Sequence, residues 1–293
     1  MNYEEQIERL ISISKKKPLL PENFIPWDIP VQETEVFLPD DLVSLHGLAE
    51  YDELSEIQKR DIGRHEVVQV MYSYAWSEGL FCLFMNRYIL SLKTHQVEYR
   101  FLLRELIEEF RHQEMFTMAI ENLEGTALPP TWIHKIVGLV TVRFFPHDIA
   151  FISCLAMEMM ADRYGEILRK GPNVYPVLKK LSELHNIEEA RHILFTKLIL
   201  QKYTAKAGFI RRSIYSYVIL LNIYFLRTLY VKQRIFERVG IRDSQGIYNK
   251  AYKNYKQKFG ESCLDDIKEF VREINGFNRA TRWAWRIFLK TKI

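Results

Sequence analysis

The chain has 293 residues, 48% of them hydrophobic and 27% charged, which is typical of a folded protein with a substantial core. Its 41 basic and 37 acidic residues give a formal net charge of +4, and no basic patch interleaved with aromatic residues is present, so we expect no nucleic-acid partner. The three cysteines form no CxxC pair, which excludes a disulfide framework and favours a reducing, cytoplasmic location.

The first 56 residues predict an arm that packs on the rest of the chain. They begin with a short amphipathic helix that lacks the apolar core and cleavage site of a signal peptide. A proline-rich extended segment, PLLPENFIPWDIP, and an acidic stretch follow. Residues 57–293 are expected to form one domain.

Scarce glycine (12) and proline (10) predict a mostly helical domain. Residues 137–145 have the best β composition, but Pro146 follows them and no partner strand is evident, so we expect a helix or connector. The apolar segment 213–226, bracketed by Arg212 and Arg227, falls short of the ~20 residues of a membrane span and is expected to be a mostly buried helix. The helices are predicted at 57–92, 96–123, 147–169, 174–204, 210–238, 244–258, 262–274 and 278–290.

An internal repeat connects the four long predicted helices. The pattern EE-x-R-H occurs at 108–112 and again at 188–192, an offset of 80 residues. The same offset relates Glu78 to Glu158, each 31 residues before the second glutamate of its EE pair. The chain therefore reads as two matching halves.

Helix geometry shows what the two halves can build. The second glutamate of each EE pair and the histidine three residues later lie side by side on one helix face. In ferritin-like four-helix bundles, two Glu and two Glu-x-x-His elements project inward and bind two metal ions. Glu78 and Glu158 stand in apolar stretches, where an unpaired carboxylate would be costly. We therefore expect an all-α fold, a ferritin-like four-helix bundle with additional C-terminal helices.

Two alternatives remain open at this level. Helix periodicity does not decide which glutamate of each EE pair is the ligand; the Glu-x-x-His precedent selects Glu109 and Glu189, which leaves Glu108 and Glu188 as supporting or surface residues. The other alternative is a bundle without metal, in which Arg111 and Arg191 form buried ion pairs with glutamates.

With these residues in place, residues 57–205 resemble the diiron arylamine N-oxygenase family, the p-aminobenzoate N-oxygenases, within the ferritin-like proteins. That family's ligand order is Glu, E-x-x-H, Glu and H-x3-E-x2-H. His185 matches the extra histidine, at the position where the repeat would place Glu105, so one iron should carry more imidazole than the other. The resemblance implies these metal ligands: Glu78, Glu109, His112, Glu158, His185, Glu189 and His192.

The resemblance also implies a function. Two Fe ions in a non-haem diiron centre would activate O2 to oxygenate the nitrogen of an amine substrate, free or carrier-bound, in natural-product biosynthesis. No catalytic residue beyond the ligands is expected. No GxGxxG fingerprint is present, so electrons would come from an external reductase. A homodimer is the default expectation. The alternatives are a diiron oxygenase acting on carbon, such as a hydroxylase or desaturase, a non-catalytic ferritin-like metal binder, and a helical scaffold.

Other residues carry weaker signals. Asp162, one turn after Glu158, and the two arginines beside the ligand histidines are candidate supporting residues, with simple ion pairs as the alternative. The remaining histidines lack metal-like spacing and are expected to be structural or on the surface. Several apolar residues near the ligands are expected either to line a pocket or to belong to the core: Met71, Tyr74, Phe81, Phe116, Met157 and Phe195.

Overall fold

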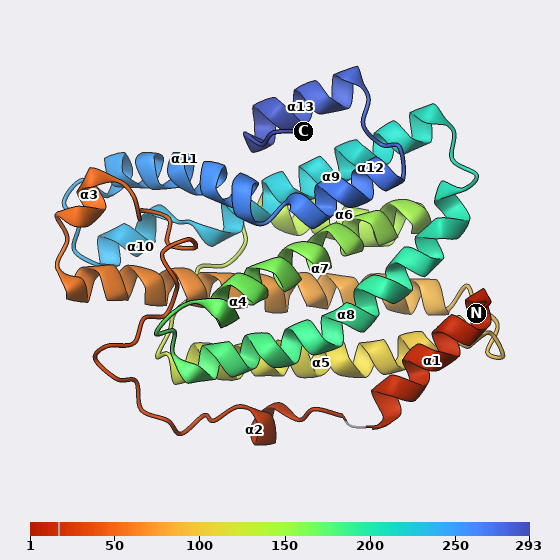
Figure 1. The fold of residues 1–293 in the computed structure, drawn as a ribbon, viewed down its shortest axis with the longest axis horizontal. Coiled ribbons are helices and arrows are strands. Elements are labelled where there is room, and N and C mark those ends of the chain that lie inside the picture. The colour runs from red at the N-terminus through yellow and green to blue at the C-terminus, as the bar shows by residue number, and fades with distance from the viewer. Residues whose placement is uncertain (17) are drawn as a thin grey trace.

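The computed structural model describes residues 1–16 and 18–293, and within these ranges it contains helices and one isolated β-bridge but no strand (Figure 1). The all-α prediction is confirmed. The helices are α1 (Tyr3–Lys16), α2 (Pro21–Phe24), α3 (Ala49–Asp52), α4 (Glu56–Ile89), α5 (Val97–Asn122), α6 (Trp132–Phe144), α7 (His147–Lys170), α8 (Pro176–Thr204), α9 (Phe209–Tyr230), α10 (Gln233–Arg238), α11 (Ser244–Ser262), α12 (Asp265–Glu273) and α13 (Arg279–Leu289).

Four long helices form the bundle. α4 pairs with α5 and α7 pairs with α8, each pair joined by a short connection, at residues 90–96 and 171–175 (Figure 1). A longer connection, residues 123–146, crosses between the pairs and carries α6. Ser55 and Gln58 form a capping box that starts α4, which then runs unbroken through Glu78. The bundle therefore brings the middles of four helices together.

The predicted bounds of the four bundle helices agree with the structure to within three residues. The single helix expected at 210–238 is wrong, because Val231 and Lys232 adopt extended backbone conformations that separate α9 from α10. The Val231 side chain is buried, and the Lys232 ammonium donates to the Thr228 carbonyl, 2.7 Å away, near the end of α9. Tertiary contacts thus decide this break.

α9 is only half-buried, which corrects the expectation of a mostly buried helix. One face packs against α4, α7 and α13, while the other exposes an apolar stripe. The segment Phe209–Arg238 contains a window long and apolar enough to cross a membrane by composition, yet 56% of that window is buried within the fold. Packing against the core therefore explains why the buried residues of this window are apolar.

The N-terminal arm is held on the bundle by specific contacts. α1 packs against α5 and α8. Val36 forms the isolated bridge with Val174, beside the turn between α7 and α8. Farther along the arm, the Ser44 backbone N–H and hydroxyl both donate to the buried Glu66 carboxyl on α4. The arm therefore contacts both halves of the bundle.

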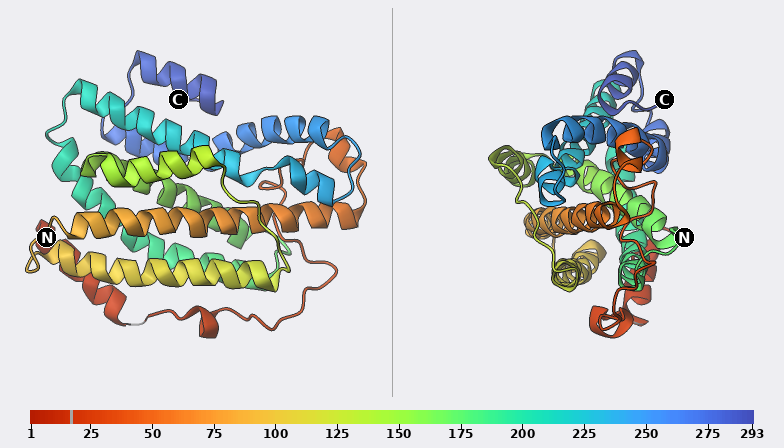
Figure 2. Two further views of the ribbon diagram at one scale, coloured as in Figure 1. Left: turned by 180° about the vertical axis from the view of Figure 1, so that it is seen from behind. Right: turned by 90° about the vertical axis from the view of Figure 1, so that its left-hand side faces the viewer.

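α6 lies on the outer side of α4 and projects from the body of the molecule (Figure 2). Its one glycine, Gly138, faces Leu80 and Trp76 of α4, and a Cβ at Gly138 would lie 2.4 Å from a Leu80 methyl carbon. Glycine therefore allows this close approach. The segment 137–145, expected to be a helix or connector, falls mostly within α6.

Candidate metal centre

Eight ionisable side chains meet in the middle of the bundle. They include all seven predicted ligands and one further carboxylate, Glu105 of α5. Their donor atoms form three groups, and the atoms of each group lie within 4.8 Å of one another. The groups are Glu78, His112, His185 and Glu189; Glu105, Glu109 and His192; and Glu109, Glu158 and Glu189. All four bundle helices contribute, as the repeat predicts.

Two carboxylates belong to more than one group. Glu189 is shared between the group that holds two histidines and the group that holds Glu158. Glu109 is shared between the group that holds His192 and the group that holds Glu158. The Nδ1 atom of His192 lies 3.0 Å from Glu109 and 3.4 Å from Glu189. Shared carboxylates between two donor groups are the arrangement that bridges a pair of metal ions.

The two ends of the cluster differ in imidazole content. His112 and His185 gather with Glu78, whereas His192 is the one histidine among the donors of the other two groups. The Nε2 atom of His185 lies 3.2 Å from Glu78 and 3.4 Å from Glu189. This asymmetry follows from the break in the repeat, where His185 replaces the counterpart of Glu105.

Glu108 and Glu188 form hydrogen bonds with the ligand histidines on the side away from the cluster. Glu188 of α8 lies 2.9 Å from the Nε2 atom of His112 on α5. Glu108 of α5 lies 2.9 Å from the Nε2 atom of His192 on α8. Each EE-x-R-H motif therefore supports the histidine of the other. With Nε2 donating outward, Nδ1 of each imidazole points into the cluster, where a bound metal ion would take the place of the Nδ1 proton.

The alternative in which Glu108 and Glu188 are surface residues is wrong, since both are buried. Arg111 and Arg191 donate to the supporting carboxylates, so they form the ion pairs that the sequence analysis gave as the alternative. Arg111 lies 3.2 Å from Glu188, and Arg191 lies 3.0 Å from Glu108. Asp162 does not orient an imidazole: it accepts from the side chain of Asn186, next to His185.

The donor set fits metal ions better than it fits a set of ion pairs. Among the described residues, several buried donor atoms of the cluster have no hydrogen-bond partner. An uncompensated buried carboxylate costs several kcal/mol, roughly, unless it binds a proton or a cation. Mixed carboxylate and imidazole donors suit iron and exclude a thiolate-type site. The unpartnered atoms are Glu78 Oε2, Glu105 Oε2, Glu109 Oε2, His112 Nδ1, both oxygens of Glu158, Glu189 Oε2 and His192 Nδ1.

Burial and mutual repulsion dominate the electrostatics of the cluster. Burial, reinforced by neighbouring carboxylates, raises the pKa of Glu78, Glu105 and Glu158 well above its usual range. Burial lowers the pKa of His185 to about 4, so this imidazole is neutral at physiological pH and free to bind a metal ion. Bound cations would relieve the repulsion among the carboxylates.

Glu105 is the residue that the sequence analysis left out of the ligand set. A signal for it was present: it lies four residues before Glu109, on the same helix face, and the repeat places it opposite His185. It is buried, and it groups with Glu109 and His192. The family's ligand pattern has no place for it, which is why resemblance alone did not select it.

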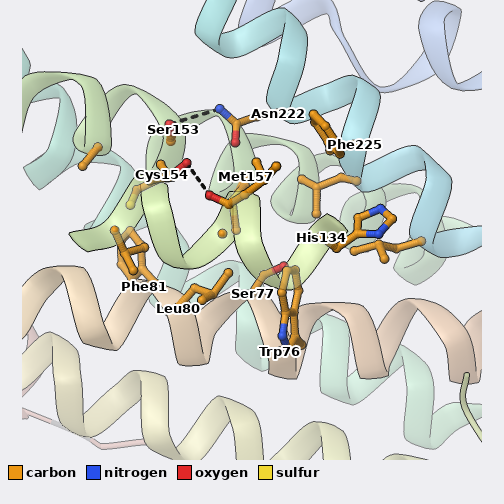
Figure 3. A pocket seen from close by; sticks show the side chains of 17 residues that line it. Trp76, Ser77, Leu80, Phe81, His134, Ser153, Cys154, Met157, Asn222 and Phe225 are labelled. Atoms are coloured by element: carbon orange, nitrogen blue, oxygen red, sulfur yellow. Dashed lines mark hydrogen bonds between the residues drawn. The ribbon is translucent and has the colours of Figure 1, made fainter. Parts of the chain in front are cut away.

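Two apolar cavities lie near the cluster, and Figure 3 shows the residues that line the larger one. A smaller cavity of about 40 Å³ touches Glu78, Glu109, Glu158, His185 and Glu189 directly. A second cavity, of about 80 Å³, lies between α4, α6, α7 and α9. The two share several lining residues, so the second lies directly beside the first. The shared residues are Ser77, Phe81, Cys154, Met157 and Leu226.

The six apolar residues expected near the ligands fall into two groups, those that line a cavity and those that belong to the core. Phe81 and Met157 line both cavities, and Tyr74 lines the smaller one. The other three, Met71, Phe116 and Phe195, are buried core residues. His134, expected to be structural, lines the larger cavity with both ring nitrogens bound to threonine hydroxyls, at 2.6 and 2.7 Å.

The chain is similar to known proteins. Uncharacterized proteins of mycobacteria, Rv0885 of Mycobacterium tuberculosis and Mb0909 of Mycobacterium bovis, are each 27% identical to the chain over 213 residues. The match covers 68% of this chain but 61% of either relative, so the chain spans less than two thirds of their length. The model of the p-aminobenzoate N-oxygenase AurF family matches residues 1–275. The chain belongs to the p-aminobenzoate N-oxygenase AurF family.

Proposed function

We propose that the protein is a non-haem diiron oxygenase that uses O2 to oxygenate an amine nitrogen. The observation that carries this proposal is the buried donor cluster with its unpartnered atoms, next to an apolar cavity, in a member of an N-oxygenase family. In balanced form, an amine, O2, two electrons and two protons would give a hydroxylamine and water. Two bound irons would supply the O2 activation and the electron transfer.

The residues of the chain have distinct roles in this proposal. Glu109 and Glu189, each common to two donor groups, would be shared by the two metal ions, and Glu78 and Glu158 would each bind one. His112 and His185 would serve one ion, and His192 with Glu105 the other, following the donor groups. Glu108 and Glu188 accept the Nε2 protons and so keep each imidazole in the ligating tautomer.

The apolar cavity is the proposed substrate site. Its wall is mostly aliphatic and aromatic, with few polar groups (Figure 3). The two cavities together are of the order of the ~150 Å³ that holds a benzene ring. Ser77, whose hydroxyl lacks a hydrogen-bond partner among the described residues, lines both cavities and can bind one polar substituent. A small, largely apolar amine fits this wall.

Other parts of the proposal are the expectations of the sequence analysis. An external reductase would deliver the electrons, and the protein would act in the cytoplasm, in a natural-product pathway. A homodimer is the simplest assembly. The substrate would be free or attached to a carrier. A diiron oxygenase acting on carbon is the alternative that the apolar cavity also favours, because an acyl chain would contact the same wall.

The test begins with metal content. Protein loaded anaerobically with Fe(II) should bind two irons per chain, and Glu158→Gln should lose one of them, because it removes a terminal ligand. Asp148→Asn, a buried carboxylate on the same helix that is bound by Arg211 and Tyr215, is the control and should keep both irons. Unchanged iron content in Glu158→Gln would rule out the site.

Reaction products then separate the two oxygenase functions. The iron-loaded protein, with a chemical reductant and O2, is incubated with an arylamine or with a fatty acyl substrate. Hydroxylamine, nitroso or nitro products support N-oxygenation. A hydroxylated or desaturated acyl chain would replace that function with carbon oxidation. Iron binding without any product would identify a non-catalytic metal binder.

A further inference from the structure

An acid-free apolar surface covers one side of the molecule. We define the α6/α9/α13 face as the exposed residues of these three helices, which lie in succession in the left view of Figure 2. Contacts link the three helices: the rings of His134 and Phe225 join α6 to α9, and those of Tyr224 and Phe288 join α9 to α13. The exposed large hydrophobic residues are Trp132, Ile133, Ile136, Val137, Leu139, Val140, Phe144, Phe209, Ile210, Ile214, Tyr217, Leu221, Tyr224, Trp283, Ile287 and Phe288.

The pattern on each helix is regular. On α9 the exposed apolar residues recur every three or four positions, from Ile210 to Tyr224, and so form one continuous stripe. On α6 almost the whole surface is apolar, and His134 is its one buried residue. Trp132 is 70% exposed and Trp283 is 62% exposed. An apolar patch this extensive marks an interaction site.

Charge is distributed unevenly over the chain. α6 carries two Lys or Arg residues, α9 three and α13 three, so these helices hold eight of the 41 basic residues and none of the 37 acidic ones. The exposed basic residues are Lys135, Arg143, Arg279, Arg282 and Arg286. A partner for this face must therefore be apolar at its centre and negatively charged.

A second copy of this chain does not have that chemistry. In a two-fold symmetric interface the same face meets itself, so the arginines and lysines would face like charges with no carboxylate to pair with. An anionic lipid surface provides both requirements. Tryptophan, phenylalanine and aliphatic side chains enter the headgroup region, and arginine and lysine contact the lipid phosphates.

The larger cavity lies beneath this same face. Val137 of α6 lines the cavity and is 38% exposed, and Phe225 of α9 lines it next to the exposed Tyr224. Met157 and Phe81 line both this cavity and the smaller one at the metal cluster. An apolar molecule dissolved in a bilayer could thus enter the cavity without crossing water.

We propose that the α6/α9/α13 face binds the surface of an anionic membrane, with the helices lying in the headgroup region. Binding by this face does not depend on the proposed oxygenase activity. Entry of a membrane-dissolved substrate through the larger cavity rests on the proposed oxygenase activity. The vesicle experiment below tests membrane binding alone.

The experiment measures sedimentation of the full chain with vesicles. Binding to vesicles of phosphatidylcholine and phosphatidylglycerol is expected, with weaker binding to phosphatidylcholine alone and at high salt. Ile136→Gln/Leu139→Gln removes two half-exposed apolar side chains from α6 that do not line the cavity, and should weaken binding about tenfold or more. Arg282→Glu/Arg286→Glu should abolish the preference for phosphatidylglycerol.

The matched control lies on α5, away from the face. Leu103→Gln/Ile107→Gln changes the same two residue types, which are 44% and 60% exposed, and should bind vesicles like the parent protein. Circular dichroism and thermal melting of each variant confirm folding. Three results would overturn the proposal: no binding of the parent, equal loss in control and test variants, or a parent dimer that Ile136→Gln/Leu139→Gln converts to a monomer.

Discussion

At the scale of single residues, the reciprocal support of the histidines is the feature that most clearly distinguishes this site from a chance cluster. Glu188→Gln keeps the shape of the side chain but removes the charge that accepts from His112 and pairs with Arg111. Loss of such support lowers metal affinity by roughly 10- to 100-fold. We expect that loss for Fe(II), measured by competition with a chromogenic chelator.

The control for this prediction lies on the same helix. Glu183→Gln removes an exposed carboxylate of α8 that pairs with Lys180, and it should leave the Fe(II) affinity unchanged. Equal affinities in Glu188→Gln and the parent protein would show that Glu188 has no part in metal binding.

At the scale of elements, one buried carboxyl joins the N-terminal arm to the bundle. Burial raises the pKa of Glu66 to about 7, although Ser44 of the arm donates to it. The folded state therefore favours the protonated form. The contribution of Glu66 to stability is fully present below its unfolded pKa near 4.5, decreases as the pH rises, and is lost above about pH 7.

Glu66→Gln tests this contribution. The amide mimics the protonated acid, so the free energy of unfolding of the variant, relative to the parent, should increase by roughly 3 kcal/mol between about pH 5 and pH 8. Urea unfolding of the iron-free variant and parent at both pH values measures this free-energy difference. Titration of the metal cluster affects both proteins equally and therefore cancels in the difference. A difference that stays constant with pH would contradict the raised pKa.

At the scale of the whole molecule, the metal ions should contribute to stability. The bundle interior holds a cluster with five glutamates, and bound iron would neutralise the negative charge of their carboxylates. A ligand that binds only the folded state at a thousand times its Kd stabilises the protein by about 4 kcal/mol. Removal of Fe(II) by a chelator should therefore lower Tm by several degrees, as measured by anaerobic calorimetry.

Two variants test whether the Tm increase comes from iron bound at the cluster or from iron bound elsewhere on the protein. Glu158→Gln removes a ligand and should reduce the Tm increase that iron causes. Glu66→Gln removes a buried carboxyl outside the cluster and should keep the full increase. An identical Tm with and without Fe(II) in the parent protein would contradict the metal centre.

The sequence by itself determined the helical fold and the composition of the cluster. Apolar periodicity and scarce Gly and Pro are local properties, so the bundle helices could be predicted closely. The repeat placed Glu78 and Glu158 at equal distances from the two EE-x-R-H motifs, and a bundle has one inner face per helix. That combination is enough to bring seven predicted ligands together.

Only the tertiary structure decided contacts between residues far apart in the chain. The roles of Glu108 and Glu188 depend on which helix faces which, because each supports a histidine about 80 residues away. Packing between helices likewise decides three other features. These are the break after α9, the place of Glu105 in the metal cluster, and the cavity against α6. Helical periodicity specifies the direction of a side chain around its own axis, but the partner that it meets is set by how the helices assemble.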